Sequence, residues 1–391
     1  MTVYLPVTQR TMKIQRFLSN ARLRRGAAVV LSALVLAACG TSKPKPAELP
    51  KSPEIMGVTQ AWSFKLPDVE FPLVTDVSDD VVAVAGGDKG TVMAIDARTG
   101  KELWRVDVGA PLNAGVGSDG TLSAVVTRDN DLVALQGGHV LWKKNLGAET
   151  FTPPLVAGRR IFVQTADRTT SAWDGQSGRR LWTQTRNADA LVLKRPGVLQ
   201  AVDDALVAGV GARLVSMAAT NGASRWEAPI ASPRGTNDVE RLADLTGTIS
   251  VAGGTICARA YYANVGCVDA NRGVLLWTKP ATGSVGVSGD ENTLYGVEQN
   301  GVVLSWRRRD GEQQWSNDAF KYRQMTAPLA AGRTLIIGED GGNLLFLDRA
   351  DGKLLARVSP DGSAIVADPV VAANTLVVVT AKGGVFGYRP K

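Results

Sequence analysis

A repeat of about forty residues, marked by tryptophan, runs through the chain from residue 62 to its C-terminal end. Between the tryptophans lie short runs of alternating apolar residues, the pattern of β-strands, separated by turn residues. This period and pattern predict one four-stranded antiparallel sheet per repeat, and eight copies predict an all-β, eight-bladed β-propeller. The repeat position holds Trp62, Trp104, Trp142, Trp182, Trp226, Trp277 and Trp315, and Ala356 in the eighth copy.

The clearest copy runs from Gly90 to Trp104 and contains Asp96 and Gly100. The Asp side chain can accept backbone N–H groups in the turn between the last two strands, and the Gly can take positive φ at its end. The tryptophan ring is large enough to fill the space between neighbouring blades. Because one blade cannot bury both of its faces, the copies are expected to stack around an axis.

The two ends of the repeat region are complementary. The first copy, Ala61–Phe64, supplies only a fourth strand, and the last copy, Gly384–Tyr388, stops after a third strand. Together they would complete one blade, so N- and C-terminal strands are predicted to close the ring. An open solenoid of the same repeats is the alternative.

The N-terminal region has the pattern of a lipoprotein signal peptide. Arg22, Arg24 and Arg25 precede the apolar run 27–36, which is too short for a membrane-spanning helix, and small residues then lead to Cys39. This resembles the bacterial lipobox, in which the cysteine is lipidated. An ordinary signal peptide with a chance cysteine is the alternative.

The sequence therefore divides into a lipoprotein signal peptide (1–38), a lipidated Pro-rich tether (39–58) and the propeller (59–391). Gly40 stands where Asp is usual in lipoproteins retained at the inner membrane, so the resemblance implies the periplasmic face of the outer membrane. Six basic residues and no acidic one precede Cys39, which leaves 38 basic and 37 acidic residues. This balance gives no reason to expect nucleic acid as a partner.

Residues for catalysis or cofactor binding are missing from the motifs. His139 is the single histidine, no Cys/His spacing is typical of a metal site, and no Gly-rich phosphate loop opens a helix. We expect no enzyme activity, cofactor or metal. Cys257 and Cys267 flank an expected hairpin tip, where they could form a disulfide or remain as free thiols.

Two connections between blades depart from the ordinary repeat. One runs from Thr185 to Pro196, and the other from Ile230 to Asp244. Both join an outer strand to the next inner strand and both flank the same blade, so we expect them side by side on one face. Their apolar and charged residues suit a protein partner. Alternatively, Leu191 and Leu193 belong to an ordinary inner strand.

The repeat resembles that of pyrroloquinoline-quinone dehydrogenases, but it lacks the adjacent cysteine pair that many of them carry. The lipobox, the Pro-rich tether, the eight repeats and the segment 238–244 together resemble the BamB family of the outer-membrane β-barrel assembly machinery. The resemblance covers nearly the whole mature chain. It implies a non-catalytic scaffold that binds POTRA domains of a BamA-like barrel-forming subunit. As a further hypothesis, unfolded outer-membrane proteins would be partners through strand addition at blade edges.

By this resemblance, a Leu-x-Leu-Arg run and an acidic residue of the second connection contact the POTRA domain. Lys194 departs from the family's Arg, although Arg195 follows, and Thr246 stands where a second Asp is usual. A periplasmic quinoprotein and a ligand-binding propeller are the alternative functions. The partner-binding residues predicted here are Leu191, Leu193, Lys194, Arg195, Glu240, Arg241 and Asp244.

Overall fold

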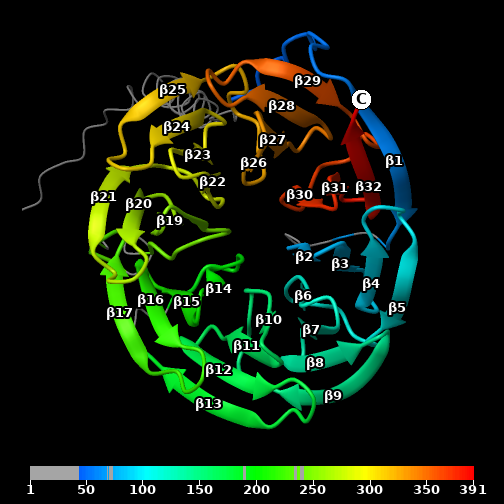
Figure 1. Ribbon diagram of the computed structural model, residues 1–391, viewed down its shortest axis with the longest axis vertical. Helices are drawn as coiled ribbons and strands as arrows, with labels where there is room; N and C mark the ends of the chain where they lie inside the picture. Colours follow the sequence, from blue (N-terminus) through cyan, green and yellow to red (C-terminus); the bar gives the residue numbers. More distant parts are fainter. Residues whose placement is uncertain (1–43, 68, 70–73, 188–190, 233–235, 238–241) are drawn as a thin grey trace, which may run out of the picture. The chain divides into compact units, whose positions relative to one another are not determined.

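Thirty-two strands in eight four-stranded antiparallel sheets make up the described part of the chain. The structure is a computed structural model that describes residues 44–67, 69, 74–187, 191–232, 236–237 and 242–391. Residues 46–391 form one compact unit, in which the sheets are arranged as blades around a ring (Figure 1). The predicted eight-bladed β-propeller is confirmed. None of the described residues forms a helix long and apolar enough to cross a membrane.

Within each blade the strands follow one another from the central channel outward. Blade 1 contains β2 (Asp76–Ser78), β3 (Val81–Gly86), β4 (Thr91–Asp96) and β5 (Glu102–Asp107), and blade 2 contains β6 (Gly117–Ser118), β7 (Leu122–Val126), β8 (Asp131–Gln136) and β9 (His139–Asn145). Blade 3 contains β10 (Leu155–Ala157), β11 (Arg160–Gln164), β12 (Thr169–Asp174) and β13 (Arg180–Thr185), and blade 4 contains β14 (Leu199–Val202), β15 (Ala205–Val210), β16 (Arg213–Ala218) and β17 (Ser224–Pro229). Blade 5 contains β18 (Ser250–Ala252), β19 (Thr255–Ala260), β20 (Asn264–Asp269) and β21 (Leu275–Pro280), and blade 6 contains β22 (Ser288–Gly289), β23 (Thr293–Val297), β24 (Val303–Arg307) and β25 (Gln313–Asn317). Blade 7 contains β26 (Leu329–Ala331), β27 (Thr334–Gly338), β28 (Leu344–Asp348) and β29 (Leu354–Val358), and blade 8 contains β30 (Val370–Ala372), β31 (Thr375–Val379), β32 (Gly384–Pro390) and β1 (Val58–Lys65).

Ring closure follows the predicted scheme. The first strand, β1, pairs antiparallel with β32, with Val58 opposite Pro390 and Phe64 opposite Val385. Blade 8 therefore takes three strands from the C-terminal end of the chain and its outer strand from the N-terminal side, as the neighbouring blue and red strands in Figure 1 show. A continuous ladder joins the two ends of the repeat region and leaves no unpaired seam.

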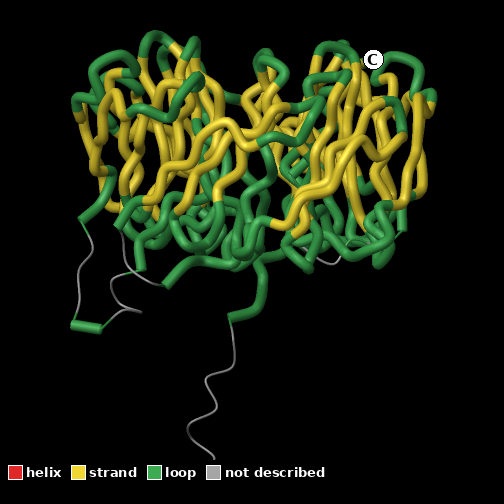
Figure 2. The backbone as a smooth tube through the Cα atoms, turned by 90° about the horizontal axis from the view of Figure 1, so that it is seen from below, coloured by secondary structure: helices red, strands yellow, loops and turns green. Residues whose placement is uncertain are grey.

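The Asp-x-x-x-Gly motif forms the turn between the third and fourth strands of a blade. In the clearest copy, the side chain of Asp96 accepts the backbone N–H of Thr99 at 2.8 Å, and Gly100 has φ +72°. Such turns lie on one face of the ring, which we call the turn face. The connections from one blade to the next lie on the opposite face, which we call the connection face. Figure 2 shows the strands spanning the ring between the two faces, with the longer loops gathered on one of them.

Each tryptophan of the repeat joins its blade to the next blade. Trp315, on β25, donates its indole N–H to the carbonyl of Arg349 at 3.0 Å and lies against Gly352 in the following turn. A one-residue bulge in the outer strand precedes the tryptophan, as at Trp182, where Ala172 faces Trp182 but Trp173 faces Arg180. The bulge interrupts the ladder and alters the direction of the side chains that follow it.

Candidate functional site

The two unusual connections flank blade 4 and meet on the connection face. The first joins β13 to β14, and Leu191 and Leu193 lie in it outside any strand. The second joins β17 to β18 and contains Asp244. The backbone N–H of Leu193 donates to Asp244 Oδ2 at 3.0 Å, so the two connections are in direct contact.

Arg168 donates hydrogen bonds to both connections. It lies in the turn between β11 and β12, and its Nη2 donates to Asp244 Oδ1 at 2.9 Å and to the carbonyl of Leu191 at 2.8 Å. Only 10% of each side chain of the Arg168–Asp244 ion pair is exposed. Three segments from different parts of the sequence are therefore fixed by one carboxylate and one guanidinium group. Sequence reasoning missed Arg168, because nothing in its local sequence distinguishes it from other turn residues.

This arrangement separates the predicted partner-binding residues into two groups. Leu191, Lys194 and Arg195 are exposed at the surface. Leu193 is half-buried, and Asp244, with 7% of its surface exposed, is buried. Glu240 and Arg241 lie outside the described residues, as does Cys39.

The two exposed cations point toward different neighbours. Lys194 Nζ lies 5.5 Å from the ring centre of Phe151 and 3.9 Å from Glu149 Oε1, both in the connection between β9 and β10. The guanidinium of Arg195 lies 6.0 Å from the ring centre of Tyr261, in the turn between β19 and β20. Positive charge and aromatic surface therefore extend from blade 3 to blade 5 across the connection face.

A groove of about 770 Å³ opens beside Leu191. Its charged lining includes two further arginines around one carboxylate: Arg186 pairs with Glu227, and Arg213 Nε lies 3.5 Å from Glu227 Oε2. The groove thus offers an apolar residue at its edge and both signs of charge inside. Such a surface can recognise a folded protein domain by an apolar anchor with a charged rim.

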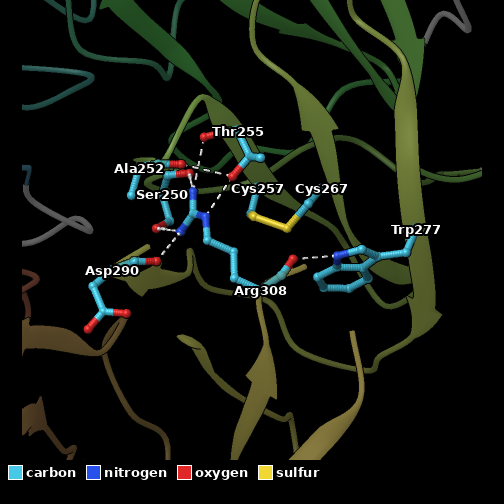
Figure 3. The surroundings of a disulfide bond; sticks show 8 residues. All are labelled: Ser250, Ala252, Thr255, Cys257, Cys267, Trp277, Asp290 and Arg308. Carbon is cyan, nitrogen blue, oxygen red and sulfur yellow. Dashed lines mark hydrogen bonds between the residues drawn. A yellow bond between two sulfur atoms is a disulfide. The ribbon is translucent and has the colours of Figure 1, made fainter. Parts of the chain in front are cut away.

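Cys257 and Cys267 form a disulfide between the directly paired strands β19 and β20, with their Cα atoms 4.0 Å apart. Both residues are fully buried. Figure 3 shows them beside Trp277, whose indole N–H donates to the carbonyl of Arg308 at 2.7 Å. The disulfide is therefore part of the interface between blades 5 and 6, away from the surface.

Arg308 is a second buried cation that sequence reasoning missed. It belongs to blade 6, but its guanidinium donates to Ser250 and Thr255 of blade 5, with 2.7 Å from Nη2 to the carbonyl of Ser250 (Figure 3). Burial lowers the pKa of Arg308 to about 10, so the group stays charged at neutral pH. Its role is to join two blades.

The central channel forms a second cavity, of about 790 Å³, lined by the inner strands and the loops that precede them. Among the described residues, the carboxyl groups of Asp76, Asp340 and Asp368 line it. Burial raises the pKa of each of these groups, including Asp368, which accepts a hydrogen bond from Ala327 N at 2.8 Å. Within the described residues, no group of three or more His, Cys, Asp or Glu side chains is placed to hold a metal ion.

Comparison with known proteins identifies the family. The family model described as outer membrane protein assembly factor BamB matches residues 88–317 and 321–391. An outer membrane protein assembly factor BamB from Burkholderia pseudomallei is 38% identical over 379 residues, which cover 94% of this chain and 99% of that protein. The chain belongs to the BamB family.

Solved structures agree with the fold. The crystal structure of BamB from Moraxella catarrhalis matches with a TM-score of 0.77 at 22% identity, covering 85% of this chain and all of that one. A quinohemoprotein alcohol dehydrogenase from Comamonas testosteroni matches with a TM-score of 0.66 at 15% identity, covering 86% of this chain and 77% of that one. The BamB family thus shares its blade architecture with a group of enzymes, and the architecture alone does not distinguish their functions.

Proposed function

We propose that this chain is a non-catalytic scaffold lipoprotein that assists folding and insertion of outer-membrane proteins. In this proposal it is anchored through Cys39 at the periplasmic face of the outer membrane and binds POTRA domains of a BamA-like barrel-forming subunit. Membership of the BamB family supports the assembly role, since the relatives are named assembly factors and their similarity extends over nearly the whole chain. Unfolded outer-membrane proteins would be transient partners.

The observation that carries the proposal is the pairing of the two connections around blade 4. The hydrogen bonds from Arg168 and from Leu193 N to Asp244 hold the surface before any partner arrives. A surface ordered in advance loses less conformational entropy on binding. An assembly factor that positions other domains benefits from such a rigid contact.

Roles follow from exposure. Leu191 would be the apolar anchor, with Lys194 and Arg195 as the charged rim. Leu193 and Asp244 would act as positioning residues, because their polar contacts are made inside the chain. Glu240 and Arg241 would contribute to the same contact from the second connection.

Leu191→Glu tests the contact, with Leu103→Glu as its matched control. The two leucines have 40% and 47% of their surface exposed, and Leu103 lies on β5 of blade 1. We expect Leu191→Glu to reduce co-purification with the barrel-forming subunit about tenfold or more, because it removes an apolar anchor and buries a charge. Leu103→Glu should co-purify like the wild type. Equal recovery of both variants would contradict the proposed surface.

Two further measurements test the remaining parts. Cys39→Ser should move the protein from the outer-membrane fraction to the soluble periplasmic fraction, and continued membrane association of this variant in the absence of the partner would contradict the anchor. Quinone absorbance or calcium-dependent dehydrogenase activity in the purified protein would support the quinoprotein alternative instead.

A further inference from the structure

The Pro-rich segment in front of β1 lies against the outside of blade 7. We call residues 46–57 the N-terminal strap; it is drawn in blue outside β29 in Figure 1. The backbone N–H of Ile55 donates to the carbonyl of Leu355 at 3.0 Å, and Arg357 N donates to Ser52 Oγ at 3.2 Å. The strap therefore runs antiparallel to β29, whose outer edge would otherwise be unpaired.

The start of the strap is fixed on the connection face. Ala47 N donates to the carbonyl of Lys321 at 2.9 Å, and Arg323 donates to the carbonyl of Ala47 from both Nε (3.0 Å) and Nη2 (2.8 Å). Lys321 and Arg323 belong to the connection between β25 and β26. Arg323 is itself oriented by Glu339, whose Oε2 lies 2.8 Å from Nη1 and whose side chain is fully buried.

Apolar contacts support these hydrogen bonds. Leu49 is half-buried against the core cluster that contains Phe320 and Leu345. Met56 packs into the cluster of Ala356 and Tyr388. The strap thus contributes an apolar side chain at the one repeat position where tryptophan is replaced by alanine.

The ring closure explains why that tryptophan is missing. Elsewhere the indole lies on the turn of the next blade, as Trp315 does on Gly352. After blade 7 the next blade is closed by β32 and β1, which are separate ends of the chain with no turn between them. A tryptophan at position 356 would find no such turn, and residues of the strap occupy this region instead.

We propose that the strap sets the orientation of the propeller on the membrane. Its hydrogen bonds begin at Ala47 on the connection face, so residues 39–47 alone remain as the tether of the lipidated Cys39. The eight Cα–Cα steps from Cys39 to Ala47 span about 29 Å at most. A tether that made no contacts with the propeller before Val58 could span about 68 Å. The connection face, with the groove beside Leu191, is therefore held toward the lipid surface. This inference rests on the proposed anchor at Cys39.

Hydrogen exchange on the soluble chain beginning after Cys39 tests the strap independently of the anchor. We expect the amides of Ala47 and Ile55 to be protected about 100-fold or more relative to an unstructured peptide, because both donate to backbone carbonyls. Leu49→Asp should remove most of this protection, since it places a charge in an apolar contact. Lys51→Asp, at an exposed position of the same segment, is the control and should leave protection unchanged. If these two amides exchange in the wild type as fast as in an unstructured peptide, the binding of the strap to blade 7 is contradicted.

Energy transfer on vesicles tests the orientation with the lipidated full chain. Gln299→Cys and Arg309→Cys place a dye at opposite ends of β24, on the connection face and the turn face respectively, at exposed positions. The two positions are separated by roughly 20–25 Å, so transfer to an acceptor lipid should be about twofold stronger from position 299. Adding Leu49→Asp and Arg323→Ala should remove this difference. Equal transfer from both positions in the otherwise unchanged chain would overturn the orientation.

The failure of the anchor is distinguishable from the failure of the strap. If the full chain does not associate with vesicles at all, the proposed anchor at Cys39 is wrong, and the proposed orientation is wrong as well. The exchange experiment would still decide whether residues 46–57 are bound to blade 7. If the amides are protected and the chain associates with vesicles but shows equal transfer, the strap exists without setting the orientation.

Discussion

Asp244 and Leu193 lie 51 residues apart in the sequence and are joined by a hydrogen bond of 3.0 Å from Leu193 N to Asp244 Oδ2. The other carboxylate oxygen of Asp244 is paired with the largely buried Arg168. One acidic residue therefore fixes the position of a loop that it does not belong to. Its importance for partner binding would come from this internal role rather than from contact with the partner.

Asp244→Ala is expected to reduce both stability and partner binding. Removing the carboxylate takes an ion-pair partner away from the largely buried guanidinium of Arg168, which should cost about 3 kcal/mol in the free energy of unfolding. The loop around Leu193 also loses its acceptor. Chemical denaturation and a binding assay with the isolated periplasmic domains of the proposed partner measure the two effects.

The double variant Arg168→Leu with Asp244→Leu separates these two effects. An apolar pair of similar volume should recover most of the stability lost in Asp244→Ala, because both charges of the buried ion pair are removed together. It cannot replace the hydrogen bonds to Leu191 O and from Leu193 N. Binding should therefore stay weak while stability returns. Full binding by this double variant would show that the ion pair has no positioning role.

Gly352 is the best position to test the contact between a tryptophan and the next blade. Gly352 has φ +73°, and a Cβ on it would lie 2.6 Å from Cζ3 of Trp315. Gly352→Ala should therefore lower the free energy of unfolding by about 2–4 kcal/mol, through a strained backbone and displacement of the indole. The midpoint of urea unfolding measures this change.

Gly332→Ala is the matched control for that variant. Gly332 also has positive φ, at +56°, but a Cβ there would meet no atom within 4 Å. Only the backbone term of about 1 kcal/mol should remain. Equal destabilisation at positions 332 and 352 would mean that the tryptophan contact contributes nothing beyond backbone strain.

The repeat explains why the fold could be predicted from the sequence. The spacing of Asp96, Gly100 and Trp104 combines a turn, its positive-φ residue and an interblade contact in nine residues, and similar spacing recurs around the ring. The incomplete first and last copies likewise predicted the pairing of β1 with β32. Local patterns were sufficient here because seven of the eight blades are built from consecutive strands.

The contacts at the candidate site could be predicted only in part. The two connections were expected to lie side by side, and they do. The burial of Asp244 depends on Arg168, which is 76 residues away and carries no local signal. The composition of the Pro-rich segment also predicts a spacer. It does not indicate that Ala47 forms hydrogen bonds with a connection more than 270 residues later in the sequence. Ala356 in place of tryptophan was the one visible sign of an unusual blade edge.

Asp368→Asn tests the electrostatics of the central channel. Burial raises the pKa of Asp368 above its ordinary value of 3.8, so the folded protein binds a proton more readily than the unfolded chain does. This group stabilises the fold fully below about pH 3.8, and that contribution is lost as the pH rises through the raised pKa. At pH 7 the burial of this carboxyl group therefore opposes folding, and an uncharged amide oxygen in its place can still accept from Ala327 N.

We accordingly expect Asp368→Asn to raise Tm at pH 7 by about 2 °C or more. The difference in Tm between variant and wild type should shrink as the pH falls toward 3.8, where Asp368 becomes protonated in both states. Comparing variant with wild type at each pH removes the contribution of the other channel carboxyl groups. A difference in Tm that grows on acidification would contradict the raised pKa.

The disulfide between Cys257 and Cys267 should stabilise the fold without taking part in binding. It closes a loop of ten residues, so replacing both cysteines with alanine should cost about 3 kcal/mol in the free energy of unfolding. Since both residues are fully buried between blades 5 and 6, dithiothreitol should reduce the native protein only as fast as it opens, and the denatured protein at once. Thiol trapping followed by mass spectrometry measures both rates. Rapid reduction of the native protein, or loss of partner binding in the folded double variant, would show that this part of the ring is more open or more directly involved in binding than its burial indicates.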